Sequence, residues 1–252
     1  MAHGGAELEQ RGCDLLGLER RLCSEPMLTF AVGGTFESNI SAVEAGYGAR
    51  ASHVKRTQKL AARVAIELCL QPDEIRVVWY AAVLHDLGKL RIPDSILDKP
   101  GKLNESEWEI VRRHPERGAK MLAGIAGFER IRAAVAAHHE RFDGCGYPAG
   151  LVGLDIPIEA RLISVADAYD AMTSYRPYRT TLGHLQAMEQ LGAGVGSQFD
   201  PAVVEATKAV LHDNGGSHVA KEQESELSSP PSLSPPTQRG KEAEPRNPRI
   251  RA

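Results

Sequence analysis

The sequence predicts an all-α fold. Apolar residues recur at helical spacing through most of residues 45–212, proline and acidic or amide residues stand where helices would begin, and no alternating segment of convincing strand length appears. Hydrophobic residues make up 42% and charged residues 25% of the 252-residue chain, as is usual for a soluble globular protein. We therefore expect one helical domain over residues 45–212, formed as a bundle.

The first two helices of this domain are predicted by apolar spacing and by a proline. In HVKRTQKLAARVAIELCL, Leu60, Val64 and Leu68 repeat at i, i+4 and i+8 and form one apolar face. Pro72 is followed by two acids, and proline and acidic residues are both favoured in the first turn of a helix. The second helix should therefore begin at Pro72 and continue through VVWYAAVLHD to Gly88.

The remaining helices also have recognisable start signals. Asn104 and Glu107 have the spacing of a capping box. Pro115 cannot lie inside that helix and should open the next one, which leaves His114 at the junction. Further helices are predicted in IRAAVAAHH, from Pro157 through IEARLISVADAYDAMT, around Leu185 to Leu191, and from Asp200-Pro201 onward.

The two ends of the chain differ from the central domain. Residues 1–44 have Gly33-Gly34 and few regular patterns, and we interpret them as a short lead-in, the remnant of a regulatory region. Residues 213–252 are rich in paired prolines, serines and charges and have too few apolar residues for a core. This C-terminal tail is predicted to be disordered.

Bulk properties exclude several classes of protein. No segment approaches the roughly 18 apolar residues of a membrane span, and the N-terminus has no secretory signal. The four cysteines form no CxxC motif, which favours reduced thiols over disulfides or a thiolate metal site. The net charge of −3 argues against DNA or RNA as a partner. We expect a cytoplasmic protein without membrane contact.

The chemistry is indicated by histidines and aspartates near predicted helix ends. An aspartate in the apolar run ISVADAYDAM is costly to bury unless it is paired or binds a cation. Imidazole and carboxylate together suit Mn, Fe or Zn, and seven ligands suit two octahedral ions that share a carboxylate. Such an ion pair activates water and stabilises a phosphodiester, so phosphoester hydrolysis is the expected reaction. The candidate ligands are His53, His85, Asp86, His114, His138, His139 and Asp167.

Each candidate ligand could also have an ordinary structural role. His53 could be a solvated histidine on a cationic helix face, and His114 could cap a helix. The adjacent pair of histidines that ends a helix could interact with the helix dipole. Asp167 could pair with Arg161 or Arg176. These alternatives stay open residue by residue, although five such coincidences in one domain are jointly improbable.

A longer set of motifs resembles one family. HDLGK begins at His85 and is followed by RRHPERG, HHERFDGCGYPAGLVG, IPIEARLISVADAYDAMTSYRPYR and SQFDP. In order and spacing these segments resemble the HD-GYP domain, part of the HD superfamily of metal-dependent phosphohydrolases, over about Gly46 to Leu211. The resemblance implies a phosphodiesterase for cyclic di-GMP that uses iron or manganese, with the GYP loop beside the metal centre and the seven candidate residues as ligands.

The resemblance also implies individual roles. Asp86 would bridge the two ions, and Lys89 would act with it in catalysis by neutralising charge on the phosphoryl oxygens. Substrate contacts are implied for Lys89, Gly146, Tyr147, Asp170, Arg176 and Arg179. The ordinary alternatives are a solvated lysine, a glycine-rich turn with a core tyrosine, and a surface cluster of salt bridges.

Two positions depart from the family pattern or vary within it. Some members have a glutamate four residues before the first ligand histidine, associated with a third metal, where this chain has Ala49. We therefore hypothesise two ions and the linear dinucleotide pGpG as the main product, with GMP secondary. Cys145 lies at the variable place of DGxGYP, where an inert small residue is favoured over a redox-sensitive thiol.

Two rival functions follow from the same residues. One is a catalytically silent receptor that binds cyclic di-GMP or presents the GYP loop to a partner such as a diguanylate cyclase of the GGDEF type. The other is an HD-type hydrolase of a different cyclic dinucleotide or nucleotide. A homodimer is the assembly considered.

Overall fold

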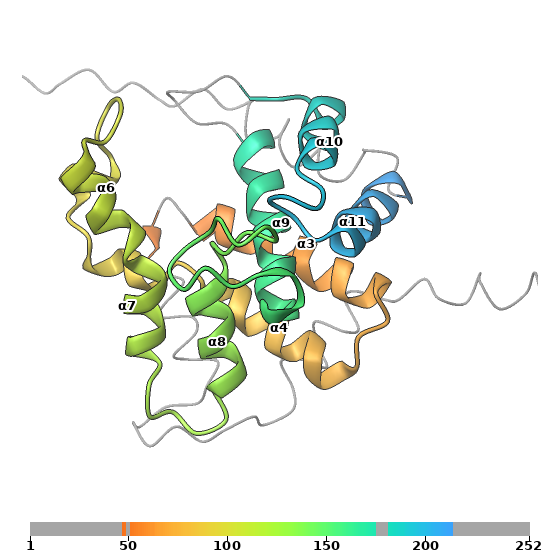
Figure 1. Ribbon diagram of the computed structural model, residues 1–252, viewed down its shortest axis with the longest axis horizontal. Helices are drawn as coiled ribbons and strands as arrows, with labels where there is room; N and C mark the ends of the chain where they lie inside the picture. Colours follow the sequence, from red (N-terminus) through yellow and green to blue (C-terminus); the bar gives the residue numbers. More distant parts are fainter. Residues whose placement is uncertain (1–46, 49–50, 175–180, 214–252) are drawn as a thin grey trace, which may run out of the picture. The chain divides into compact units, whose positions relative to one another are not determined.

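The computed structural model describes residues 47–48, 51–174 and 181–213 (Figure 1). The described chain is helical, and its β-pairing is limited to an isolated bridge between Val195 and Phe199. The all-α prediction is confirmed. The elements are α3 (Ala51–Glu67), α4 (Pro72–Leu84), η3 (Leu87–Arg91), α5 (Asp94–Leu97), α6 (Glu105–Arg112), α7 (His114–Met121), α8 (Glu129–Ala137), η4 (Gly153–Asp155), α9 (Ile158–Thr173), α10 (His184–Ala193) and α11 (Pro201–Asp213).

Several sequence predictions concern residues outside these ranges. The lead-in of residues 1–44 and nearly all of the predicted tail lie there, as do Ala49, Arg176 and Arg179. The domain boundaries at 45 and 212 therefore stay predictions.

The helix starts lie where local signals predicted them. Pro72 is the first residue of α4. The Asn104 side-chain oxygen accepts a hydrogen bond from the backbone N–H of Glu107 at 2.8 Å, and the Glu107 carboxylate accepts one from the backbone N–H of Asn104 at 2.8 Å. Asp200 accepts a hydrogen bond from the backbone N–H of Ala202 at 2.8 Å, at the start of α11. Each signal satisfies N–H groups that a helix start leaves unpaired.

The helix ends differ from the predictions, for reasons of backbone conformation and packing. Helix α3 ends at Glu67, and Cys69 then adopts a left-handed backbone with φ of 55°. Helix α4 ends at Leu84, not at Gly88, because the chain tightens into the 3₁₀ helix η3. A Cβ atom on Gly88 would lie only 2.0 Å from the backbone oxygen of His114, so the glycine allows η3 to pack directly against α7.

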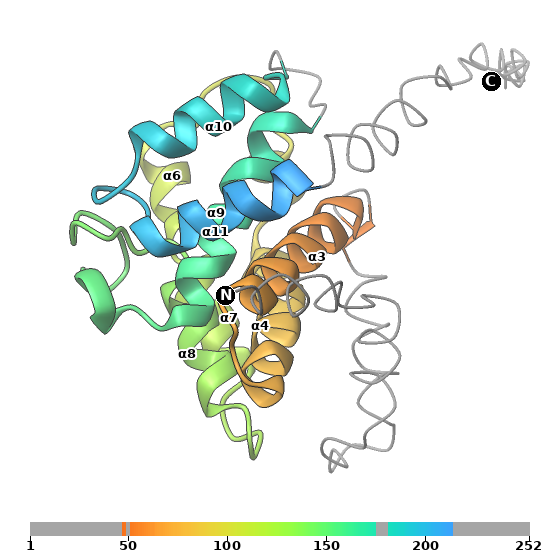
Figure 2. The same cartoon turned by 90° about the vertical axis from the view of Figure 1, so that its right-hand side faces the viewer.

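The core is formed by helices that converge on α4 and α9. Helix α3 packs against both of them, α8 also packs against both, and α11 packs against α3 and α9 (Figure 2). Val54, Val78 and Ile163 are fully buried in this core. Because α7 packs against η3 and α8, the C-terminal ends of α4 and α8 come together with the start of α7. None of the helices in the described ranges is both long and apolar enough to span a lipid bilayer.

Candidate metal centre

The five predicted histidines and two aspartates lie together. Neighbouring histidine rings have centroids 4.2 to 6.0 Å apart, although the residues come from distant parts of the chain. Five of the seven lie where a helix begins or ends, and His53 and Asp167 lie within helices. They are His53 in α3, His85 and Asp86 after α4, His114 at the start of α7, His138 and His139 after α8, and Asp167 in α9.

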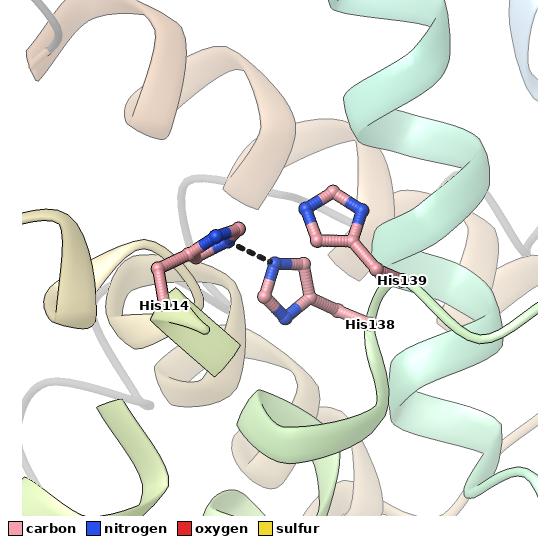
Figure 3. A group of neighbouring side chains, drawn as sticks. All are labelled: His114, His138 and His139. Atoms are coloured by element: carbon pink, nitrogen blue, oxygen red, sulfur yellow. Dashed lines mark hydrogen bonds between the residues drawn. The ribbon is translucent and has the colours of Figure 1, made fainter. Parts of the chain in front are cut away.

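One group within this cluster consists of His114, His138 and His139 (Figure 3). Their rings point toward one another, and one nitrogen of each lies within 4.8 Å of those of the other two. The Nε2 atoms of His114 and His138 are 3.1 Å apart. This geometry matches three imidazole ligands facing a common point.

The protonation of this group leaves lone pairs directed inward. The Nδ1 atom of His114 donates to the carbonyl of Val111 at 2.8 Å, and that of His138 donates to the carbonyl of Val135 at 2.8 Å. Burial, with a contribution from neighbouring cationic groups, lowers the pKa of His114 and that of His139 to about 3, so these rings are neutral near pH 7. Burial, with His139 and His85 beside it, also holds the pKa of His138 well below its usual range. In neutral His114 and His138 the single proton is on Nδ1, so both facing Nε2 atoms are acceptors. A cation beside them would satisfy both.

The second group consists of His53, His85 and Asp86. Nδ1 of His85 donates to the carbonyl of Ala82 at 2.7 Å, and its Nε2 atom is buried without a hydrogen-bond partner in the described chain. A buried polar atom without a partner is costly unless a ligand binds it. The inward lone pair of His85 therefore also fits a cation.

Asp86 lies between the two groups. Its carboxylate oxygens are 3.4 Å from Nε2 of His114 and 3.6 Å from Nε2 of His85, and Nζ of Lys89 is 2.8 Å away. Burial alone would raise the pKa of Asp86, but Lys89 and the surrounding histidines hold it well below its usual range. Asp86 is thus an anion placed where one carboxylate could serve two cations.

His53 is held between two carboxylates. Its Nε2 is 3.1 Å from Asp167 and its Nδ1 is 2.6 Å from Asp170. Burial lowers the pKa of His53, but hydrogen bonds and charge interactions with both aspartates overcome this effect and raise it to about 9. With this pKa His53 is cationic near pH 7, so the Nε2–H group can donate to Asp167.

Asp170 lies behind His53. Its carboxylate accepts hydrogen bonds from Nε of Arg56 at 2.5 Å and from the hydroxyl of Ser174 at 2.9 Å, in addition to the contact with His53. The residue is 4% exposed. A carboxylate in this position could orient His53, as outer partners of metal-binding histidines do, and the predicted contact of Asp170 with substrate stays a prediction.

The donor set fits divalent transition metals. It combines imidazole nitrogens with carboxylates, a mixture suited to iron, manganese or zinc. No cysteine of the described residues belongs to either ligand group, and Cys69 and Cys145 are exposed. The inward Nε2 lone pairs of His85, His114 and His138 are free to bind a cation, and a cation could replace the proton of His53 that faces Asp167. The cluster could therefore bind metal ions.

The GYP loop, which contains Gly146, Tyr147 and Pro148, is fixed beside the group of His114, His138 and His139, called the His114 group below. The buried Glu140 carboxylate accepts hydrogen bonds from the backbone N–H groups of Ala149 at 2.6 Å, Gly150 at 3.1 Å and Leu151 at 3.2 Å. A Cβ atom on Gly146 would lie 2.3 Å from the backbone nitrogen of Arg141, so only glycine fits there. The loop is therefore held closely against the backbone that follows α8.

Other predicted substrate residues are only partly described. The Tyr147 ring stacks on His139 with centroids 5.0 Å apart, and Lys89 lies beside Asp86. Arg176 and Arg179 lie outside the described residues. The alternative pairing of Asp167 with Arg161 is not seen, because Arg161 forms an ion pair with Asp200.

Sequence reasoning missed three residues of this region, namely Arg56, Arg112 and Glu140. Glu140 directly follows the two adjacent histidines and precedes a glycine-rich loop, a signal that could have identified it as a loop anchor. Arg56 stands three positions after His53 and so shares its helix face, which was a weaker signal. Arg112 is the first residue of the RRHPERG segment, but nothing in that segment predicted its contact with Tyr147.

The fold and the cluster together define a helical domain with a histidine and aspartate centre. The sequence profile of the HD domain family matches residues 37–203. The chain belongs to the HD domain family, which confirms the family predicted from the motifs.

Curated relatives carry related names. The chain is 45% identical over 167 residues to the cyclic di-GMP phosphodiesterase response regulator RpfG of Xanthomonas campestris, covering 66% of this chain and 44% of that protein. It is 42% identical over 174 residues to a cyclic di-GMP phosphodiesterase of Vibrio cholerae, covering 63% and 35%. It is 40% identical over 167 residues to the 3′3′-cGAMP-specific phosphodiesterase 2 of Vibrio cholerae, covering 66% and 32%. The match thus spans less than half the length of each of these relatives.

Solved structures share the fold. A crystal structure of a cyclic GMP-AMP-specific phosphodiesterase of Vibrio cholerae matches with a TM-score of 0.56 at 17% identity, over 77% of this chain and 52% of the other. Bd1817, described as an HDG“Y”P protein of Bdellovibrio bacteriovorus, matches with a TM-score of 0.55 at 18% identity, over 80% of this chain and 70% of the other. At these identities the likeness concerns the helical fold alone.

Proposed function

We propose that this chain is a metal-dependent phosphodiesterase that hydrolyses cyclic di-GMP in signalling. The observation that carries the proposal is the position of Asp86 between two groups of inward-facing ligands, with the GYP loop packed beside them. Support for the substrate comes from relatives that are named cyclic di-GMP phosphodiesterases at 45% and 42% identity.

Two divalent ions, iron or manganese, are the proposed cofactors. His53, His85 and Asp167 would hold one ion, the His114 group would hold the other, and Asp86 would be shared. When bound, such a pair lowers the pKa of water and stabilises charge on a phosphodiester. The hypothesis of two ions and of pGpG as main product follows from Ala49 and is retained.

The other side chains act around this centre. Lys89, which lies beside Asp86, would become free to neutralise a phosphoryl oxygen once Asp86 ligates cations. Asp170 would orient His53 so that Nε2 faces inward. The Tyr147 ring and the close backbone at Gly146 would contact the guanine side of the substrate, and Arg176 and Arg179 keep their predicted roles in substrate binding.

The decisive experiment uses the full chain. Protein purified anaerobically and loaded with manganese or iron is incubated with cyclic di-GMP, and the products are identified by mass spectrometry. We expect pGpG. Absence of product from a metal-loaded protein that still binds cyclic di-GMP would contradict the proposal and favour the receptor function, whose proposed partner is a GGDEF-type diguanylate cyclase.

Replacement of Asp86 by alanine tests the shared ligand. Turnover should fall by more than roughly 100-fold, because changes merely outside the ligand shell already cost metal sites 10- to 100-fold. Glu205→Ala is the matched control, since Glu205 is an exposed acid of α11 that pairs with Lys208. Wild-type turnover by a metal-loaded Asp86→Ala protein would contradict the assignment.

A second candidate substrate is 3′3′-cGAMP. The relative with this specificity is 40% identical over 167 residues, only slightly less than the cyclic di-GMP phosphodiesterases. Competition between the two dinucleotides in one reaction decides between them, with faster consumption of cyclic di-GMP expected.

A further inference from the structure

Arg112 lies beside the metal centre, although it contacts none of the ligand atoms. It is the last residue of α6 and stands two positions before His114. Its guanidinium carbon is 4.8 Å from the centroid of the Tyr147 ring. That ring in turn stacks on His139 at 5.0 Å, with the two planes inclined by 26°. A single aromatic ring therefore separates this cation from the His114 group.

The junction between α6 and α7 fixes this position. The carbonyl of Val111, directly before Arg112, accepts the hydrogen bond from Nδ1 of His114. Helix α6 starts at the capping box of Asn104, and α7 packs against η3 and α8. The backbone of Arg112 is thus held by the same contacts that orient a candidate metal ligand.

Arg112 differs from its neighbour in its ion pairing with the acidic side chains that the structure describes. The next residue, Arg113, is exposed and forms an ion pair with Glu109 at 3.1 Å. Within residues 47–48, 51–174 and 181–213, no carboxylate forms such a pair with Arg112. A guanidinium that lies over an aromatic ring keeps its N–H groups, which point outward in its own plane, available to an acceptor.

We propose that Arg112 is a substrate-binding residue that donates paired hydrogen bonds to the cyclic dinucleotide while its guanidinium stays on Tyr147. The acceptor is a planar pair of atoms, either two oxygens of a phosphate or O6 and N7 of a guanine, both of which suit the guanidinium fork. The proposal rests on the proposed function and adds a substrate-binding residue to it.

Steady-state kinetics of the metal-loaded full chain tests the proposal. Arg112→Met retains a long side chain for packing on Tyr147 but has no N–H donors. KM for cyclic di-GMP should rise roughly 10- to 100-fold, the range expected for lost hydrogen bonds to a charged group, while kcat changes less than about threefold. Metal content measured by mass spectrometry should equal that of the wild type. Arg112→Lys, which keeps the charge without the fork, should give an intermediate KM.

Arg113→Met is the matched control, because it removes the neighbouring cation of the same helix end. Its KM should equal the wild-type value. An unchanged KM in Arg112→Met would overturn the proposal and leave Arg112 with a packing role only. Equal increases in the Arg112→Met and Arg113→Met proteins would also overturn it, because general surface charge would then account for the effect.

A comparison with cyclic di-AMP shows which group accepts the hydrogen bonds from Arg112. This ligand has both phosphates but lacks O6 of guanine. Binding of cyclic di-AMP and cyclic di-GMP to the wild type and to Arg112→Met is measured by calorimetry. Weaker binding of both ligands to the variant supports a phosphate contact, and weaker binding of cyclic di-GMP alone supports a guanine contact.

Calorimetry also separates this proposal from the proposed function. A wild-type protein that binds cyclic di-GMP without turning it over would contradict the phosphodiesterase, yet the affinity of Arg112→Met would still test Arg112. A wild-type protein that binds neither dinucleotide would overturn both proposals.

Discussion

Replacement of Asp170 by asparagine tests whether a carboxylate outside the ligand set controls the metal centre. Asparagine has the same shape but only one acceptor atom and no charge. In the wild type, Asp170 accepts hydrogen bonds from His53 at 2.6 Å and from Arg56 at 2.5 Å. The amide can accept from one of these donors, and its NH₂ group must then face the other. Either His53 or Arg56 therefore loses its acceptor.

The magnitude follows from the burial of this contact. Asp170 is 4% exposed, so water does not replace the lost acceptor. Loss of an outer partner of a metal-binding histidine costs about 10- to 100-fold in metal affinity, or roughly 1.4 to 2.7 kcal/mol. Only the ion beside His53 should be affected. We expect that bound metal falls from two ions toward one per chain at limiting free metal, with the His114 group still occupied.

Metal content after dialysis at buffered free manganese measures this effect, and denaturant titration measures stability in parallel. Asp200→Asn is the matched control, because Asp200 is also a buried acid and pairs with Arg161, a residue of the helix α9 that contains Asp170. It should lower stability without changing metal content. Wild-type affinity for both ions in Asp170→Asn would refute the orienting role, and equal loss of both ions would show that the effect is not local to His53.

Two further predictions concern the GYP loop and pH. Gly146→Ala should lower the free energy of unfolding by roughly 1–3 kcal/mol and raise KM, because the new Cβ would lie 2.3 Å from the backbone nitrogen of Arg141. Gly192→Ala is the control and should have neither effect, because its Cβ would meet nothing within 4 Å. Denaturant titration and kinetics measure the difference, and equal behaviour of the two variants would argue against it. His53, with a pKa of about 9 in the metal-free chain, should release about one proton when the adjacent ion binds at pH 7 and progressively less above pH 9. Calorimetry in buffers of different ionisation enthalpy counts these protons, and a count that does not change with pH would contradict the role of His53.

Helix starts were predictable from the amino-acid sequence. The capping box of Asn104 and Glu107, and the prolines at the starts of α4 and α7, act through contacts within one helical turn. The seven candidate ligands were also predictable from their residue types and spacing. They could be recognised because histidines and aspartates are costly to bury in apolar segments unless they are paired or bind a cation.

Helix ends and supporting contacts were not predictable in this way. The pattern predicts that α4 reaches Gly88, but the chain tightens after Leu84 so that Gly88 can pass the backbone of His114. The motif predicts a substrate contact for Asp170, which stays a prediction, but it does not show that Asp170 lies behind His53. Its contacts with Arg56 and His53 join residues more than 110 positions apart, and no local pattern encodes them.

The amino-acid order alone therefore determined the helical class, where its helices begin and which side chains could bind metal, because each of these depends on neighbours a few positions away. Packing of α3, α7, α8 and α9 decided which lone pairs face each other, which aspartate supports His53, and that Arg112 lies on Tyr147. Those features depend on distances between segments far apart in the chain, which only the folded backbone sets.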